Sequence, residues 1–352
     1  MPTAPKISLP ILLLLVFAFA LTTISAQQPE APQESFVKSH YTKYEFRIPM
    51  RDGKRLFTAV YVPKLGAFPT DAGPYPIMMD RTPYSVGPYG EDQYPAHLGP
   101  SDEFEKGGYI FAYQDVRGRW MSEGEFAEMR PHIDEKKSPQ DVDDASDTYD
   151  TIEFLLKNVA NNNAKVGIWG ISYPGFYTSA SIIDSHPALA AASPHAPMTD
   201  LFLGDDTYHG GAFMLSANFG FYAPFFHPQQ NPMTPKPMVE FDFGTTDSYK
   251  FYLQAGNVAN LDKVYLKGSN WLFNDQYKHD TYDDYWQARD LSRHMKNVHC
   301  AVLVVGGWFD AEDLPARIGP SMPSASSIRR HPARWSRGPG STEDGRAAMA
   351  TI

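Results

Sequence analysis

The stretch Ala164-Lys-Val-Gly-Ile-Trp-Gly-Ile-Ser172-Tyr-Pro-Gly-Phe176 decides the fold of this chain. A short apolar run over 166–169 predicts a buried strand, and the segment 176–183, lined with small residues, predicts a closely packed helix. A serine between glycines at such a strand-to-helix turn is typical of a nucleophile elbow. Its neighbours must be small because strand and helix nearly touch, and the N–H groups at the helix start can stabilise an oxyanion.

The glycine pattern departs from the common Gly-x-Ser-x-Gly string. Pro174 takes the place of the second glycine, and Gly175 follows one position later. Loops rich in glycine and serine are common, so this string taken alone leaves an ordinary loop as an open alternative.

Composition narrows the class of protein. The 352 residues allow one large domain or two smaller ones, and an aromatic content of 14% favours packed pockets. The net charge of −10 and the lack of a basic stripe argue against nucleic-acid binding. There is no organic cofactor motif, and His279, His294 and His299 lack metal-ligand spacing, so we expect neither a cofactor nor a metal.

The amino terminus has the pattern of an export signal over 1–26. Lys6 gives a positive start, 11–21 is apolar, and Ile24-Ser25-Ala26 offers a small-residue cleavage site. The apolar run is short for a membrane span, although an uncleaved anchor is an alternative. Cys300 is the only cysteine, which excludes an internal disulfide. We expect a periplasmic or secreted protein, free of the membrane after signal cleavage, with a disordered leader over 27–40.

Apolar runs alternate with helical patterns along the rest of the chain. Strands are predicted over 44–50, 56–62, 75–79, 108–113, 166–169, 189–192 and 300–305, with a helix over 142–158 that begins with the acids Asp143, Asp144 and Asp147. This alternation predicts an α/β fold with a mostly parallel sheet over 41–198 that resumes over 298–314. The aromatic-rich segment 199–297 is predicted to be an inserted helical cap, with a separate domain as the alternative.

Four reactive side chains follow predicted strand ends: Tyr84, Asp115, Ser172 and Asp310. Sites in parallel sheets lie beyond these ends. Asp310 follows Ser172 in chain order, as the acid of a Ser…Asp…His triad does in α/β-hydrolases, although it could simply form a turn. The Tyr84 hydroxyl could donate to an oxyanion or only pack, and the N–H of Tyr173 is the natural second donor.

The sequence gives weaker signals for the general base and for the groups that would bind the substrate. Only His331 follows Asp310, and the basic residues around it make it a poor general base. The acids Asp205-Asp206, Glu312 and Asp313 could attract a substrate ammonium, chelate a divalent cation, or form a solvated rim. The segment 315–352 lacks apolar periodicity and is predicted to be disordered.

Several strings together resemble the CocE/NonD hydrolases, a family that includes cocaine esterase, X-prolyl dipeptidyl peptidases, glutaryl (cephalosporin) acylases and α-amino acid ester hydrolases. They are Asp80-Arg-Thr-Pro-Tyr84, Gln114-Asp-Val-Arg-Gly-Arg119 with Ser122-Glu-Gly-Glu-Phe126, Gly170-Ile-Ser-Tyr-Pro-Gly175 and Gly306-Gly-Trp-Phe-Asp-Ala-Glu-Asp313. The resemblance covers roughly 41–314, and in this family the elbow does read Gly-x-Ser-Tyr-x-Gly.

The resemblance implies roles for individual residues. Ser172 would be the nucleophile and Asp310 the triad acid, with the Tyr84 hydroxyl and the Tyr173 amide as the oxyanion hole. The chain looks most similar to the α-amino acid ester hydrolases, in which a carboxylate cluster binds the substrate's α-ammonium group. The matching positions are Asp206, Glu312 and Asp313, with Asp205 in place of Asp206 if the register is shifted by one.

The family pattern ends after Leu314. A further helix and strand, the string with the triad histidine, and a carboxyl-terminal jelly-roll domain do not follow, so we expect a truncated or frameshifted product with an out-of-frame tail over 315–352. Loss of the base predicts an inactive or very weak enzyme, because triad members act as a unit worth about 10⁶ in rate.

The function implied is that of a serine hydrolase or acyltransferase. It would act on esters or amides of α-amino acids, or short peptides, through an acyl-serine intermediate. Alternatives are an X-Pro dipeptidyl peptidase or another CocE-type esterase, and a non-catalytic binder of cationic ligands. A homo-oligomer is left open.

Overall fold

A computed structural model describes residues 35–68, 73–204, 206–225, 230–235, 240–307 and 310, and the backbone of 334–338. The predicted export signal and most of the predicted leader and tail lie outside these residues. None of the helices in the described ranges is long and apolar enough to cross a membrane.

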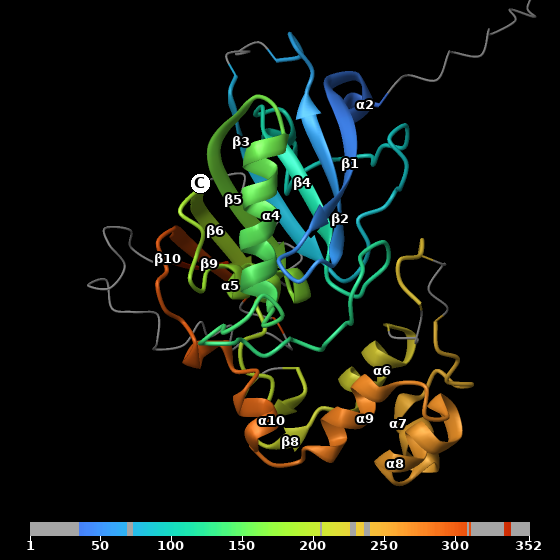
Figure 1. The fold of residues 1–352 in the computed structure, drawn as a ribbon. Coiled ribbons are helices and arrows are strands. Elements are labelled where there is room, and N and C mark those ends of the chain that lie inside the picture. Colours follow the sequence, from blue (N-terminus) through green and yellow to red (C-terminus); the bar gives the residue numbers. More distant parts are fainter. Residues whose placement is uncertain are drawn as a thin grey trace, which may run out of the picture. The chain divides into compact units, whose positions relative to one another are not determined.

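An eight-stranded sheet forms the centre of the fold, in the order β1-β2-β4-β3-β5-β6-β9-β10 (Figure 1). The strands are β1 Tyr41–Pro49, β2 Arg55–Pro63, β3 Tyr75–Thr82, β4 Ile110–Asp115, β5 Asn162–Ile171, β6 Leu189–His195, β9 Ala301–Gly307 and β10 Arg334–Gly338. β2 is antiparallel to both of its neighbours, and all other pairs are parallel. The predicted mostly parallel α/β sheet is therefore confirmed, and each predicted strand is present.

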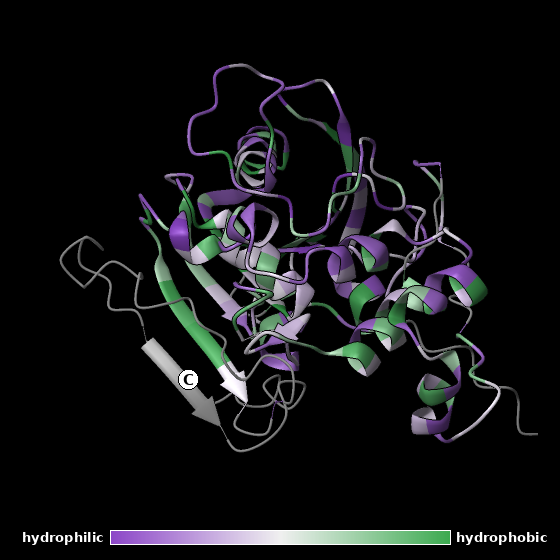
Figure 2. Cartoon of the chain, turned by 90° about the horizontal axis from the view of Figure 1, so that it is seen from below, coloured by the Kyte–Doolittle hydropathy of each residue, from purple (hydrophilic) through white to green (hydrophobic). Residues whose placement is uncertain are grey.

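Both faces of the sheet are buried, which explains the apolar runs in its strands. Alternate residues of a strand point to opposite faces. Leu56 and Val60 of β2 accordingly join one core cluster, whereas Phe57 and Tyr61 join another with the aromatic Phe111 of β4. Figure 2 shows β9 as a mainly apolar strand (green).

Helices α4 (Asp144–Asn158) and α5 (Tyr173–Ser181) cover one face of the sheet. α4 buries Ile152 and Leu155 in the sheet core. The two helices meet at a hydrogen bond of 2.7 Å between the hydroxyls of Thr148 and Ser181. In Figure 1, α4 lies in front of the sheet, where it contacts β1 and β5.

The segment between β6 and β9 is a mainly helical cap, as predicted. Its elements are the hairpin strands β7 Tyr208–His209 and β8 Ala212–Phe213, the helices α6 Leu215–Phe225, α7 Ser248–Ala255, α8 Val258–Asn260, α9 Trp271–Lys278 and α10 Asp284–Gln287, the π-helix η1 Leu261–Leu266 and the 3-10 helix η2 Leu291–Arg293. Aromatic side chains hold it together, and the same cluster includes Tyr173, Phe176 and Tyr177 of α5. The high aromatic content thus serves the contact between the cap and the elbow helix.

Two predictions of disorder are wrong in part. The last residues of the predicted leader form the helix α2, Phe36–His40, in which Val37 is buried. In the predicted tail, Arg334–Gly338 forms β10, which pairs in parallel with β9. The edge of a sheet offers free backbone N–H and C=O groups, and pairing with them requires no side-chain pattern in the added strand.

The acids at the start of α4 form the helix amino terminus that the sequence predicts. Asp143 caps the helix and accepts from the N–H of Ser146, whose hydroxyl accepts from the N–H of Asp143. Asp144 and Asp147 have further partners, because Asp144 lies 3.7 Å from Arg81 and Asp147 accepts from Arg117 at 2.6 Å.

The buried Asp144 predicts a pH dependence of stability. Burial raises the pKa of Asp144 from 3.8 to about 6, and Arg81 only partly offsets this. The native state therefore holds this proton more tightly than the unfolded chain, so the contribution of Asp144 to stability falls as the pH rises from about 4 to about 6. We expect the free energy of unfolding of Asp144→Asn, measured in urea, to rise by about 1–3 kcal/mol relative to that of the wild type between about pH 4 and about pH 6.

Asp143 provides a control, because its contribution to stability should change with pH in the opposite direction. Burial tends to raise the pKa of Asp143, but hydrogen bonds from His132, the Ile133 N–H and Lys136 lower it overall. The wild type should therefore gain stability relative to Asp143→Asn as the pH rises to about 4, and the difference should level off above that pH, where the carboxyl is ionised in both states. Differences of the same sign for the two variants would contradict this account.

Candidate active site

Ser172 lies at the turn between β5 and α5 in a strained backbone conformation. Its φ of 60° and ψ of −119° fall in a region that residues other than glycine rarely adopt. The surrounding backbone holds it there, since its N–H donates to the His195 carbonyl and its own carbonyl accepts from the Phe176 N–H, both at 3.0 Å. The side chain is half-buried. This is the geometry of a nucleophile elbow, and the ordinary-loop alternative is excluded.

The displaced glycine has a steric explanation. A Cβ at Gly170 would lie closer than 3.0 Å to the backbone of Pro174, and one at Gly175 equally close to the His195 carbonyl oxygen. The close contacts therefore fall at positions 170 and 175. Position 174 is near the start of α5, where proline is tolerated because its missing N–H has no intrahelical partner.

Tyr84 lies beside the elbow, beyond the end of β3. Its ring is 44% exposed and packs edge-on against the rings of Tyr173 and Phe225, at 6.2 and 5.6 Å between centroids. The Tyr173 side chain is fully buried, so only its backbone at the first helical position can face a reacting group. The structure thus places together Ser172, Tyr84 and Tyr173, three of the residues predicted from sequence.

Asp115 supports the Tyr84 loop and does not reach the elbow. Its carboxylate is buried and accepts from the N–H of Val86, the hydroxyl of Tyr89 and the N–H of Met121, at 2.9–3.2 Å. Burial raises the pKa of Asp115 to about 7. Asp115 was one of the four reactive side chains predicted at strand ends, and in the structure it accepts hydrogen bonds that hold the Tyr84 loop.

Asp310 lies beyond the end of β9 and is partly exposed. β6 separates β9 from β5, so Asp310 and Ser172 follow strands whose axes are about 10 Å apart. Both residues are at the carboxyl edge of the sheet, as the sequence predicts.

Asp206, the first predicted ligand of a substrate ammonium, lies at the start of the cap. Its carbonyl accepts from the Asn218 side chain at 2.9 Å, and its charge acts on the buried hydroxyl of Tyr222. The other predicted acids Asp205, Glu312 and Asp313, and also His331, lie outside the described residues.

Glu128 joins the cap to the elbow and was missed from sequence. It is buried, and its Oε1 accepts from the Tyr222 hydroxyl at 2.7 Å. Burial raises the pKa of Glu128, and hydrogen bonds from Tyr222 and Tyr173 oppose this. Tyr222 follows Glu128 by 94 positions, and no local pattern marks either residue as a partner of the other.

No histidine among the described residues contacts the Ser172 hydroxyl. His195 is next to the elbow, but its ring is fully buried and is hydrogen-bonded to the Ser193 hydroxyl at 3.0 Å. Burial lowers the pKa of His195 to about 4, which disfavours a proton on this ring at neutral pH. Its contribution to the site is the backbone carbonyl that holds Ser172.

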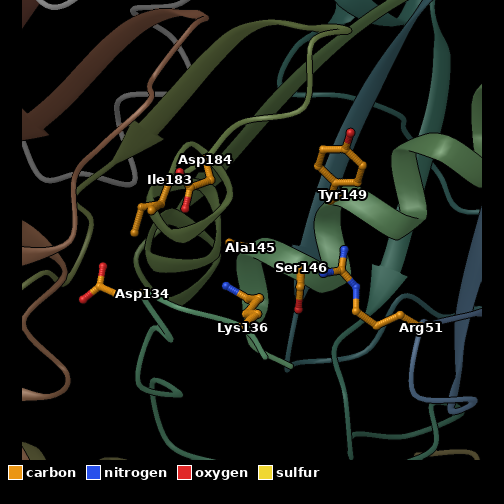
Figure 3. Close-up of a pocket in the computed structure, with 8 residues that line it drawn as sticks. All are labelled: Arg51, Asp134, Lys136, Ala145, Ser146, Tyr149, Ile183 and Asp184. Atoms are coloured by element: carbon orange, nitrogen blue, oxygen red, sulfur yellow. The ribbon is translucent and has the colours of Figure 1, made fainter. Parts of the chain in front are cut away.

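Away from the elbow, the described residues form a charged pocket and no metal site. Over the described parts of the chain, no group of three or more His, Cys, Asp or Glu side chains could hold a metal ion. Figure 3 shows a pocket of about 350 Å³ beside the start of α4, lined by Arg51, Asp134, Lys136, Ala145, Ser146, Tyr149, Ile183 and Asp184. Its charged side chains form ion pairs with neighbouring residues, and we assign it no part in the chemistry.

A family model described as X-Pro dipeptidyl-peptidase (S15 family) matches residues 52–318. The chain belongs to this S15 family. The match spans the strands from β2 to β9, and with them the elbow and the cap.

Three relatives of this S15 protein bear on its function. It is 27% identical over 273 residues to a cocaine esterase from Rhodococcus, which is 75% of this chain and 43% of the relative. It is similar in structure to an aminopeptidase from a marine sediment Thaumarchaeota archaeon, with a TM-score of 0.73, 29% identity, and coverage of 91% of this chain and 52% of that one. It is also similar to an α-amino acid ester hydrolase, with a TM-score of 0.70, 31% identity, and coverage of 91% and 51%. The chain thus spans about half the length of these relatives.

The crowded glycine of the elbow gives a prediction for the S15 protein. In Gly175→Ala the new Cβ meets the His195 carbonyl, which belongs to a rigid strand, so the turn must shift. A shift of about 1 Å at a reacting atom can cost about 100-fold in rate. We expect a loss of that order in the rate at which a fluorophosphonate probe labels Ser172, measured by mass spectrometry.

Gly167→Ala in β5 is the matched control, because its Cβ would have no neighbour closer than 3.8 Å. This variant should be labelled at the wild-type rate. Equal rates for Gly175→Ala and the wild type would show that the close approach does not set the position of Ser172.

Proposed function

We propose that this chain carries the nucleophile of a hydrolase or acyltransferase that acts on esters or amides of α-amino acids through an acyl-serine intermediate. The observation that carries the proposal is the strained, half-buried Ser172 at the strand-to-helix turn, with Tyr84 beside it. A serine held at φ 60° by its surroundings costs folding free energy, and such strain is concentrated at functional sites.

The proposed reaction follows from the positions of these groups. The Ser172 oxygen attacks the substrate carbonyl carbon, and the carbonyl oxygen becomes an oxyanion. The N–H of Tyr173 and the hydroxyl of Tyr84 donate to that oxyanion, and each such donor is worth about 10²–10³ in rate. The proton of the Ser172 hydroxyl passes to a general base, which gives it to the alcohol or amine as the bond to that group breaks. Water, deprotonated by the same base, later releases the acyl group and restores the Ser172 hydroxyl. Asp310 is the proposed acid that orients a general base.

The substrate class rests on charge. Asp206 lies near the start of the cap segment, and Glu312 and Asp313 follow Asp310 in sequence. If these carboxylates lie together near Ser172, they favour a substrate that carries an ammonium group. The names of two relatives, an α-amino acid ester hydrolase and an aminopeptidase, describe substrates with such a group and support this choice.

Two alternative functions would give different results in assays. An X-Pro dipeptidyl peptidase, the activity for which the family is named, would cleave Gly-Pro anilides in preference to phenylglycine esters. A non-catalytic protein that uses the acidic pocket to capture cationic ligands would bind them without forming a covalent adduct.

The proposal predicts a covalent adduct on one serine. With p-nitrophenyl phenylglycinate in excess, we expect slow release of up to one equivalent of nitrophenol, because no described histidine contacts the Ser172 hydroxyl as a base, and a matching mass increase on the peptide that contains Ser172. Ser172→Ala should abolish both, whereas Ser179→Ala in the same helix should retain both. Binding of the ester by folded protein without any adduct on Ser172 would overturn the proposal in favour of the binding protein.

The ammonium requirement is tested separately. Asp206→Asn should slow acylation by the free amino ester by about tenfold, the cost of losing roughly 1.4 kcal/mol of ion pairing. Acylation by the N-acetylated ester should be unchanged, because that substrate carries no charge. Equal effects on both esters would assign Asp206 to the structure of the cap.

A further inference from the structure

The carbonyl of Pro83, the residue before Tyr84, accepts two side-chain hydrogen bonds. Nε of Arg119 donates to it at 3.0 Å, and the indole N–H of Trp120 donates at 2.8 Å. On the other side of the same peptide, the N–H of Tyr84 donates to the Thr82 hydroxyl at 3.1 Å. The peptide that leads into Tyr84 is therefore fixed through both its carbonyl and its N–H.

The Arg119 guanidinium lies inside an aromatic cage, and its side chain is 2% exposed. It stacks at 4.7 Å over the ring of Phe225 and at 4.8 Å over that of Trp120, with Phe126 at 5.3 Å. A planar guanidinium suits such a site, because it can stack on rings while its edge donates hydrogen bonds.

Phe225 connects the same arginine to the cap. It is the last residue of α6, and its carbonyl lies 3.5 Å from Nη2 of Arg119. Its ring packs against the rings of Tyr84 and Tyr173, at 5.6 and 6.0 Å. Arg119 thus contacts both the backbone that leads into Tyr84 and the cap residue that packs on the Tyr84 ring.

We propose that Arg119 is the positioning residue of the Tyr84 hydroxyl, and that it makes the orientation of this oxyanion donor depend on docking of the cap helix α6. The inference rests on the proposed function, in which Tyr84 stabilises the oxyanion. Arg119 does not touch the substrate, and its effect on the reaction passes through Tyr84.

A double-mutant cycle tests this route. The variants are Arg119→Lys, Tyr84→Phe and the double variant, and the readout is fluorophosphonate labelling of Ser172, resolved into the affinity for the probe and the limiting rate. Tyr84→Phe should lower the limiting rate by about 10²-fold. Arg119→Lys should lower it by about tenfold with little change in affinity, because a lysine cannot stack and donate in the same plane.

The coupling between Arg119→Lys and Tyr84→Phe in the limiting rate decides whether Arg119 acts through Tyr84. If Arg119 acts through the Tyr84 hydroxyl, Arg119→Lys has no further effect in the Tyr84→Phe background. If the rate reductions of the two single variants multiply in the double variant, Arg119 acts independently of the Tyr84 hydroxyl, and the inference is overturned. Trp120→Phe, which removes the other donor to Pro83, should reproduce the Arg119→Lys effect in weaker form and serves if the lysine variant does not fold.

A second measurement does not depend on catalysis. With 3-fluorotyrosine at position 84, the ¹⁹F resonance should shift or broaden in Arg119→Lys and stay unchanged in Arg55→Lys, whose arginine is exposed and paired with Glu123. An unchanged resonance in Arg119→Lys refutes the inference whatever the labelling rates. A shifted resonance in a protein that never labels Ser172 would support it while refuting the proposed function.

Discussion

The approach of β5 to α5 around Ser172 is the constraint on which the site depends. Two backbone contacts, one between Gly170 and Pro174 and one between Gly175 and the carbonyl of His195, leave no room for a Cβ. With the strand and helix this close, the turn must reverse within one residue, and Ser172 takes a positive φ. The neighbouring strand β6 supplies the carbonyl that receives the Ser172 N–H. Contacts between backbone atoms therefore fix the point from which the Ser172 side chain projects.

Sequence reasoning found the sheet and its reactive edge because both leave local signals. Buried parallel strands give continuous apolar runs, and the polar residue that follows each run marks the carboxyl edge. Ser172, Tyr84 and Asp310 were located in this way. The signal did not distinguish chemistry from support, since Asp115 has the same position in the pattern and serves as an acceptor for the Tyr84 loop.

The features missed from sequence depend on partners far away in the chain. Glu128 is one polar residue among many until Tyr222 is brought against it. β10 pairs through its backbone with the edge of β9, so its side chains give no periodic signal. Apart from Asp115, the residues of the string Gln114–Arg119 were recognised only by resemblance. Its polar side chains are buried, and Arg117 forms ion pairs with Asp52 and Asp147. A search for apolar periodicity does not detect buried residues of this kind, because they are charged. Buried ion pairs of this kind add little net stability but fix geometry, because breaking one leaves a charge uncompensated.

The nucleophile and its surroundings are thus held by different parts of the molecule. Ser172 is fixed by the sheet, through strand β6 and the two crowded glycines. Tyr84 and the network at Glu128 depend on the cap, because Phe225 and Tyr222 both belong to α6. A change in the cap can therefore alter the surroundings of Tyr84, the proposed oxyanion donor, while Ser172 stays in place. Relatives that share an elbow and act on different esters and amides are the expected outcome of such a division, since the cap can vary without loss of the nucleophile.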